Sequence, residues 1–235
     1  MHPAKVAPDS SAVCTALWRA MHVRIDEDLL VQEGIGQYIL LGAGLDTFVQ
    51  RHPELATQVM VFEIDQAGPQ AGKRQRLEDL GYGVADSLRL IPVDFEAGED
   101  WWRALVDEGL DTRARALVSS SGVSMYITKV ATQATLRRLA ALVPGSIVFM
   151  TFMLPFDLLD DADRPGLEAA ARGAQASGTP WLSFYRPEEI TALARDAGFV
   201  DARTISTADL AERYLAGRAD GLRAAGGESV LVART

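Results

Sequence analysis

The stretch Tyr38-Ile39-Leu40-Leu41-Gly42-Ala43-Gly44-Leu45-Asp46-Thr47 decides the fold of this chain. Its first four residues are apolar or aromatic and predict a strand that is buried on both faces. The two glycines that follow predict a tight turn leading into a helix. In an open α/β sheet, ligands bind beyond the carboxyl end of such a strand, where glycine lets the backbone approach them closely. The stretch therefore predicts the first strand of a sheet and a ligand site next to it.

Outward from this turn, short apolar runs alternate with segments of helical period, which is the pattern of a doubly wound α/β sheet. A helix is predicted over residues 130–143, and another begins at Pro187 and ends at Gly198. The segment 209–216 and a glycine-rich stretch join the last two strands. Seven strands are expected, at residues 37–41, 58–64, 87–91, 115–119, 146–152, 199–205 and 229–233.

The length of 235 residues fits a single domain. Two segments lie outside the alternation of strands and helices. Residues 9–33 have a helical pattern, so the segment 1–35 is predicted to form a helical cap. Residues 156–183, which are rich in Asp, Gly and Pro, are predicted to be an insertion on the substrate side.

The composition excludes several classes of protein. A net charge of −9 disfavours nucleic acid as a partner, and no apolar run is long enough to span a membrane. With Cys14 as its single cysteine and no secretory signal, the protein is expected in the cytoplasm. No cluster of His, Asp and Glu has metal-ligand spacing, so we expect no metal.

Acidic residues follow the next two predicted strands. Glu63 and Asp65 stand where a ribose diol would meet a carboxylate, and their spacing leaves open which one does so. Asp94 and Phe95 follow the third strand and form a reasonable adenine pocket, because a carboxylate accepts from an amine while a ring packs on the purine. Thr47 replaces the third glycine of a dinucleotide fingerprint, which argues against a nicotinamide-dependent oxidoreductase.

Taken together, these motifs resemble the leucine carboxyl methyltransferase-like family of S-adenosylmethionine-dependent enzymes, in particular its bacterial branch. The resemblance extends from about residue 20 to the C-terminus. It implies a class I methyltransferase sheet of seven strands with the last one antiparallel. The motifs that carry it are Gly42-Ala43-Gly44-Leu45-Asp46-Thr47, Phe62-Glu63-Ile64-Asp65-Gln66, Val93-Asp94-Phe95, Gly122-Val123-Ser124-Met125-Tyr126-Ile127-Thr128 and Pro180-Trp181.

The resemblance also implies roles for single residues. Gly42 and Gly44 would line the methionine part of S-adenosylmethionine, Asp65 would bind the ribose, and Asp94 with Phe95 would hold the adenine. An arginine before the first strand, here Arg24, would pair with the carboxylate of the cofactor. The full set expected at the cofactor is Arg24, Gly42, Ala43, Gly44, Asp46, Glu63, Asp65, Asp94, Phe95 and Ser121.

Two departures from the family pattern stand out. The chain has 41 residues before Gly42, where the family has a longer helical region, so the pocket is expected to be more open or to be completed by another subunit. Ser119-Ser120-Ser121 stands where some members have a glutamate that contacts the cofactor. These departures keep a catalytically silent scaffold protein of the same fold as an alternative to an enzyme.

Methyl transfer from a sulfonium requires mainly proximity and orientation. A carboxylate on a small molecule or natural-product intermediate is already an anionic nucleophile at neutral pH, so no catalytic base is expected. His2, His22 and His52 lie away from the predicted acceptor side. The residues predicted to contact the acceptor are Ser124, Tyr126, Tyr214 and Arg218.

Overall fold

The computed structural model describes residues 30–95, 97–216 and 226–235. By its internal contacts the chain divides into two compact units, Met1–Ser121 and Gly122–Thr235. The single domain expected from length therefore stays a prediction. Most of the predicted 1–35 cap lies outside the described residues. No helix in the described ranges combines the length and the apolar character needed to cross a bilayer.

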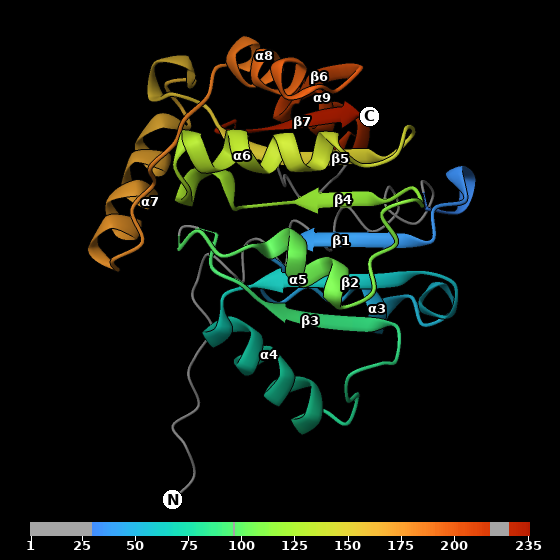
Figure 1. Ribbon diagram of the computed structural model, residues 1–235. Helices are drawn as coiled ribbons and strands as arrows, with labels where there is room; N and C mark the ends of the chain where they lie inside the picture. Colours follow the sequence, from blue (N-terminus) through green and yellow to red (C-terminus); the bar gives the residue numbers. More distant parts are fainter. Residues whose placement is uncertain (1–29, 96, 217–225) are drawn as a thin grey trace, which may run out of the picture. The chain divides into compact units, whose positions relative to one another are not determined.

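Four parallel strands form the first unit, in the order β3-β2-β1-β4 (Figure 1). Leu41 lies beside Ile64 on one side and Ser120 on the other, so these strands end together. All five residues of β1 are buried, as expected for an inner strand of a parallel sheet. The strands are β1 (Gln37–Leu41), β2 (Met60–Asp65), β3 (Leu88–Pro92) and β4 (Leu117–Ser120).

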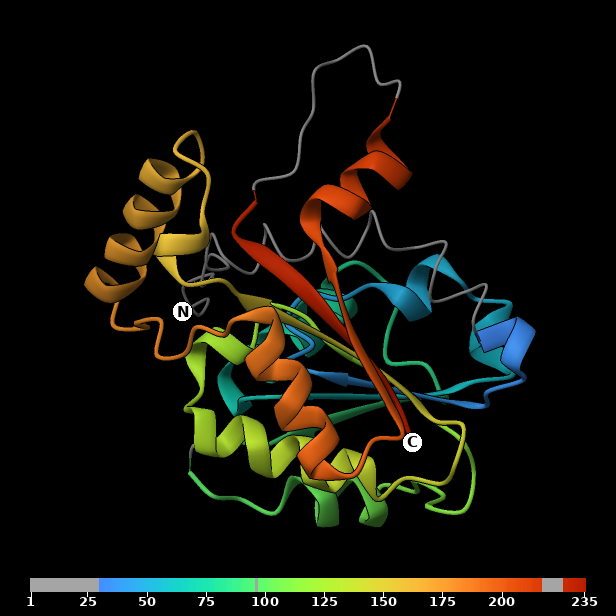
Figure 2. The ribbon, with the colours of Figure 1, turned by 90° about the horizontal axis from the view of Figure 1, so that it is seen from above.

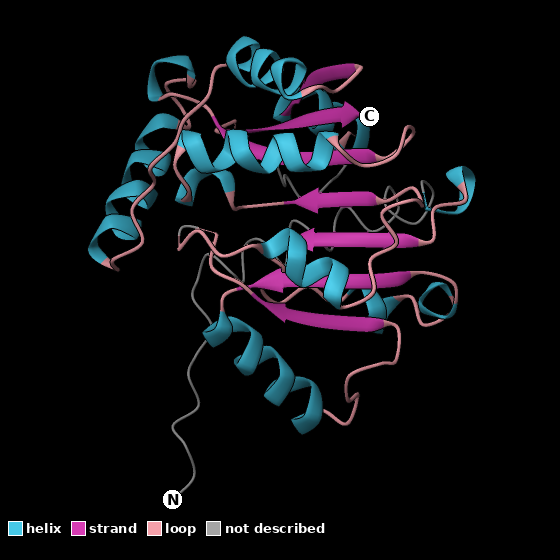
Figure 3. Cartoon of the chain, viewed as in Figure 1, coloured by secondary structure: helices cyan, strands magenta, loops and turns pink. Residues whose placement is uncertain are grey.

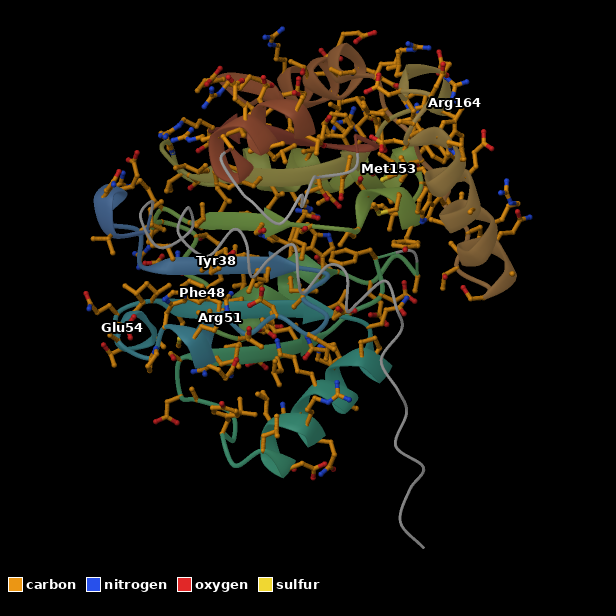
Figure 4. The ribbon with its side chains drawn as sticks, turned by 180° about the vertical axis from the view of Figure 1, so that it is seen from behind. Tyr38, Phe48, Arg51, Glu54, Met153 and Arg164 are labelled. Atoms are coloured by element: carbon orange, nitrogen blue, oxygen red, sulfur yellow. The ribbon has the colours of Figure 1, made fainter. Side chains whose placement is uncertain are left out.

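Short helices connect these strands. Tyr38 and Phe48 meet edge to face, with ring centroids 5.0 Å apart, and fix the start of α3 against β1 (Figure 4). Asp100 caps α5, because its carboxylate accepts a hydrogen bond from the backbone N–H of Arg103. The helical elements of this unit are α3 (Phe48–Arg51), η1 (Leu55–Thr57), α4 (Ala67–Asp79) and α5 (Trp101–Asp107).

The second unit contains three strands in the order β5-β7-β6, and the last strand, β7, runs antiparallel to both of its neighbours, as expected. They span Ile147–Met153, Glu228–Arg234 and Asp201–Ser206 for β5, β7 and β6. Helices α6 and α8 cover one face of these strands, and α9 covers the other (Figure 2). The helical elements are η2 (Ser124–Tyr126), α6 (Lys129–Ala140), η3 (Phe156–Leu158), α7 (Arg164–Ala176), α8 (Pro187–Ala197) and α9 (Thr207–Leu215).

All seven predicted strands are present, with small shifts at their ends. The sixth strand begins at Asp201 and not at residue 199, because Gly198 adopts φ 114° and the N–H of Phe199 still bonds to the helix carbonyl of Ala194. Helix α6 ends at Ala140 and not at residue 143, since a turn from Leu139 to Leu142 precedes Pro144.

The predicted insertion 156–183 contains a helix, α7, that the sequence analysis did not predict. Pro165 lies in its first turn, a position that suits proline. The helix is anchored beside the start of β7, where Asp163 accepts a hydrogen bond from the N–H of Gly226 at 2.8 Å. A Cβ built on Gly227 would overlap the end of the Leu167 side chain, so that side chain would have to move to admit a larger residue there.

Tyr185 is fully buried in the second unit, between α6 and the end of β5. Its ring meets Phe152 edge to face at 6.5 Å, and Lys129 Nζ lies 4.9 Å from the ring centroid. Burial raises the pKa of the Tyr185 hydroxyl above its ordinary value, and this effect outweighs the nearby Lys129 charge, which lowers it.

A pH dependence of stability follows from this shift. Above a pH of about 10 the unfolded chain loses the Tyr185 proton while the folded chain keeps it, so the free energy of unfolding falls as pH rises. Tyr185→Phe should remove this part of the slope in urea unfolding measured across the alkaline range. The exposed Tyr82 provides the matched control, since Tyr82→Phe should keep the slope. Equal slopes in the two variants would contradict the assignment.

Candidate functional site

The glycine turn after β1 is held against the end of β2. The backbone N–H groups of Gly42 and Ala43 both donate to the carbonyl of Ile64, at 2.8 and 3.0 Å. Gly42 and Gly44 adopt φ values of 67° and 51°, a region in which side chains are strained. A Cβ built on Gly44 would meet no atom within 4 Å, so the turn borders open space. The turn thus offers bare backbone to a ligand.

Asp46 supports this turn from within. Its side chain is buried, and its Oδ1 accepts from the N–H of Phe48 at 2.7 Å, at the start of α3. Its own N–H donates to Ala43 at 2.9 Å. These bonds fix the turn and the first N–H groups of the helix.

Asp65, the last residue of β2, carries a carboxylate whose two oxygens are both held by backbone donors. Oδ2 accepts from the N–H of Gly44 at 2.6 Å, and Oδ1 accepts from the N–H of Gln66 at 2.7 Å. The residue is partly exposed. Because a carboxylate offers about four lone-pair sites, each oxygen retains capacity to accept a further hydroxyl. The carboxylate is therefore oriented before any ligand arrives.

Glu63 has a different environment although it lies on the same strand. Its side chain is fully buried and forms an ion pair with Lys73 on α4, whose side chain is 4% exposed. Gln70 Nε2 donates to the Glu63 carbonyl at 2.8 Å. Of the two acids that the spacing left open, Asp65 stands at the carboxyl edge and Glu63 lies inside the unit.

Asp94 is brought close to Asp65 by the pairing of β2 with β3. The N–H of Val93 donates to the Asp65 carbonyl at 2.8 Å, and Gln66 Nε2 lies 3.4 Å from Asp94 Oδ2. The N–H of Asp94 donates to Glu99 at 2.8 Å. Loops leave β1, β2 and β3 at one edge of the unit (Figure 3). The glycine turn and both carboxylates therefore share that edge.

Phe95 follows Asp94 and is half-buried. Its ring meets Trp101 edge to face, with centroids 6.0 Å apart. Trp101 and Gln66 also lie at this edge, and the sequence motifs did not predict them. Two sequence features could have indicated them. Trp101 is an aromatic residue in the first turn of a helix, and Gln66 carries an amide next to Asp65, the acid expected at the ribose.

The remaining expected cofactor residues are only partly described. Ser121, after β4, is half-buried. Arg24 lies outside the described residues. Among the described residues, no three His, Cys, Asp or Glu side chains come together as a metal site would require.

The residues expected to contact the acceptor belong to the second unit. Ser124 is buried, and its hydroxyl donates to the carbonyl of Thr151 at 2.8 Å, so it already has a partner within the protein. Tyr126 is half-buried in η2. Tyr214 lies in α9, where its side chain is outside the description, and Arg218 is outside the described residues.

Several solved structures with similar folds are described as methyltransferases. A Thermobifida fusca protein provisionally assigned as a methyltransferase matches 92% of this chain and 79% of its own, with a TM-score of 0.65 and 21% identity. Human N-acetylserotonin methyltransferase, solved in complex with SAM, matches 96% of this chain and 54% of its own, with a TM-score of 0.56 and 15% identity. The predicted class I methyltransferase fold is confirmed.

The chain also has relatives in sequence. A Bacillus subtilis protein, YktD, provisionally named an S-adenosyl-L-methionine-dependent methyltransferase, is 31% identical over 192 residues. The match covers 81% of this chain and 62% of YktD. A Streptomyces coelicolor protein, SCO6443, with the same provisional name is 32% identical, with 64% and 50% of the two chains covered. The chain thus spans less than two thirds of these relatives.

A family model also matches this chain. The model for leucine carboxyl methyltransferase matches residues 19–140, just over half of the chain. This range includes the glycine turn, both edge carboxylates and the η2 segment. The resemblance inferred from the motifs is confirmed: the chain belongs to the leucine carboxyl methyltransferase family.

Proposed function

We propose that this protein is an S-adenosylmethionine-dependent methyltransferase that methylates a carboxylate on a small molecule. The observation that carries the proposal is the Asp65 carboxylate, which Gly44 and Gln66 hold through both oxygens beside an open glycine turn. The name of the family supports a carboxyl acceptor, and the names of the relatives support S-adenosylmethionine as the cofactor.

The residues of the first unit fit an adenosyl cofactor. An acceptor-only carboxylate at the end of β2 suits a ribose diol, which donates two hydrogen bonds. Asp94 would accept from the adenine amine, and Phe95, supported by Trp101, would pack on the purine. The backbone of Gly42, Ala43 and Gly44 would line the methionine part. Glu63 is left out of this contact, because Lys73 already neutralises its charge.

Asp46, Ser121 and Arg24 have supporting roles in this proposal. Asp46 holds the turn through the N–H of Phe48. Ser121 follows β4 at the position where the resemblance places a cofactor contact. Arg24 would pair with the cofactor's carboxylate, as the resemblance implies.

The bound cofactor supplies an electrophilic methyl group on a sulfonium. S-adenosylmethionine would give its methyl group to a carboxylate oxygen of the acceptor and would leave as S-adenosylhomocysteine. No proton moves, so the protein needs to orient the two reactants and requires no general base. Tyr126, Tyr214 and Arg218 are the proposed contacts to the acceptor. Ser124 is the weaker candidate, because its hydroxyl is bonded to Thr151.

Two alternatives make different predictions. A scaffold protein of this fold would bind the cofactor and methylate nothing. A nicotinamide-dependent oxidoreductase would need a phosphate-binding turn, and Thr47 at the third glycine position disfavours it.

Calorimetric titration with S-adenosylmethionine, S-adenosylhomocysteine and NADH tests the cofactor. We expect micromolar dissociation constants for the first two ligands and no binding of NADH. Transfer of radiolabelled methyl groups to a panel of carboxylic acids, phenols and alcohols tests the acceptor. A methyl ester releases its label as volatile methanol in alkali, whereas an ether keeps it.

The outcomes separate the three hypotheses. Alkali-labile product from the acids supports carboxylate methylation. Alkali-stable product would replace it with a phenol or alcohol acceptor. Cofactor binding without product across the panel would favour the scaffold, and binding of NADH alone would overturn the methyltransferase.

A further inference from the structure

A cluster of three aromatic side chains lies just beyond β5 in the second unit. Phe156 follows the strand, and its ring centroid lies 5.2 Å from that of Phe184. Phe184 in turn meets Trp181 edge to face at 6.3 Å. All three side chains are half-buried. In α/β sheets the ligand side lies beyond the carboxyl ends of the strands, and this aromatic cluster stands beyond the carboxyl end of β5.

The backbone that carries Trp181 is fixed at neighbouring residues. The Ser183 hydroxyl donates to the carbonyl of Ile127 at 2.7 Å, which ties the segment to the end of η2. The N–H of Tyr185 donates to the carbonyl of Met153 at 2.9 Å, at the last residue of β5. Trp181 therefore extends from a rigid support, as a binding residue requires.

The indole N–H of Trp181 is a buried donor. Its Nε1 atom has no hydrogen-bond acceptor among the described residues. Buried tryptophan N–H groups normally have a partner, because an unpaired donor loses its bond to water without replacement. A donor whose indole ring contacts another aromatic ring fits a ligand that combines an apolar body with an oxygen acceptor.

We propose that Trp181 binds the methyl acceptor and that the acceptor is an arylalkanoic acid. The indole N–H donates to one carboxylate oxygen, and the aromatic ring of the acid packs against Phe156 and Phe184. A carboxylate suits the site better than an alcohol does, because a hydrogen bond to an ionised acceptor is roughly twice as strong. The second oxygen stays free as the nucleophile. This inference rests on the proposed function and names its substrate class.

Nuclear magnetic resonance on the 15N-labelled full chain tests the proposal directly. The protein has four tryptophans, and Trp181→Phe identifies the indole signal of Trp181 by its loss. The chain is titrated with 3-phenylpropionate, with 3-phenylpropanol and with malonate, each in the presence and absence of S-adenosylhomocysteine. We expect 3-phenylpropionate to shift the Trp181 indole signal downfield, and the alcohol and the short diacid to leave it in place.

Trp181→Phe keeps an aromatic ring and removes the N–H donor. It should weaken the binding of 3-phenylpropionate by about 10- to 100-fold, the effect of losing one hydrogen bond to a charged group. The same change at the half-buried Trp102 on α5 is the matched control and should leave this affinity unchanged. The affinity for S-adenosylhomocysteine should be the same in Trp181→Phe and in the wild type.

Each outcome decides one of the two proposals. A Trp181 signal that stays in place with 3-phenylpropionate, or moves equally with the alcohol, overturns the arylalkanoic acid site. A purely structural Trp181 would lower the melting temperature of Trp181→Phe and leave the affinity for the acid intact, which also overturns it. Absence of cofactor binding, with the Trp181 shift preserved, would overturn methyl transfer and keep the acid site.

Discussion

Asp65→Ala should weaken the binding of S-adenosylmethionine by at least about 100-fold, because it removes two hydrogen bonds between a charged acceptor and the ribose hydroxyls. The loss of affinity is expected to be large because the Asp65 carboxylate is oriented before the cofactor binds. Gly44 and Gln66 hold both oxygens of Asp65 at 2.6 and 2.7 Å, so the carboxylate is in place before the cofactor binds. Calorimetric titration of wild type and variant measures the loss.

A matched control separates this effect from a general change in charge or stability. Asp79 lies at the end of α4, where its exposed carboxylate accepts from Gln75 Nε2 at 2.9 Å. Asp79→Ala removes the same charge from the same unit and should keep the wild-type affinity. Urea unfolding of Asp65→Ala should show a fold that remains intact, since water can replace a partly exposed carboxylate. Equal affinities in the two variants would remove Asp65 from the ribose site.

The fold could be predicted from sequence because its signals are local. Buried strands appear as runs of apolar residues, and the glycine turn marks where the first of them ends. Strand ends were less accurate, because they depend on bonds made by the backbone. Phe199, for example, is apolar and was assigned to a strand, yet its N–H bonds to Ala194 of the preceding helix.

The sequence could not determine whether Glu63 or Asp65 stands at the edge of the sheet where the ribose is expected. The two acids are two residues apart on a strand, so both side chains lie on the same face of the sheet. The periodicity of the strand therefore does not show which of them would bind the ribose. Tertiary packing separates them, since α4 places Lys73 against Glu63 while Asp65 stays at the strand end. Ser124 shows the same limit, because its partner is a backbone carbonyl that no sequence pattern reveals.

The amino-acid composition of the segment that contains α7 does not indicate a helix. Aspartate, glycine and proline predict loops, and four aspartates, three glycines and two prolines occur between residues 156 and 183. The helix forms nevertheless, because Pro165 lies in its first turn, where a missing N–H does no harm. Composition therefore does not predict this helix, because the effect of a proline depends on its position within the helix.

The buried pair between Glu63 and Lys73 leads to the second large effect, on stability. Glu63 is fully buried and Lys73 is 4% exposed, so neither charge is hydrated. Lys73→Met removes the cation that faces the buried Glu63 carboxylate and should lower the free energy of unfolding by about 3–5 kcal/mol. Urea unfolding monitored by circular dichroism measures this change.

The double variant Glu63→Met/Lys73→Met tests the cause. Removing both charges eliminates the desolvation cost of each, so the double variant should recover most of the stability that Lys73→Met loses. Lys129→Met, in contrast, breaks an ion pair with Glu189 in which the side chains are 48% and 38% exposed, and should cost at most about 1 kcal/mol. A double variant as unstable as Lys73→Met would mean that Lys73 stabilises the unit through the packing of its stem and not through its charge.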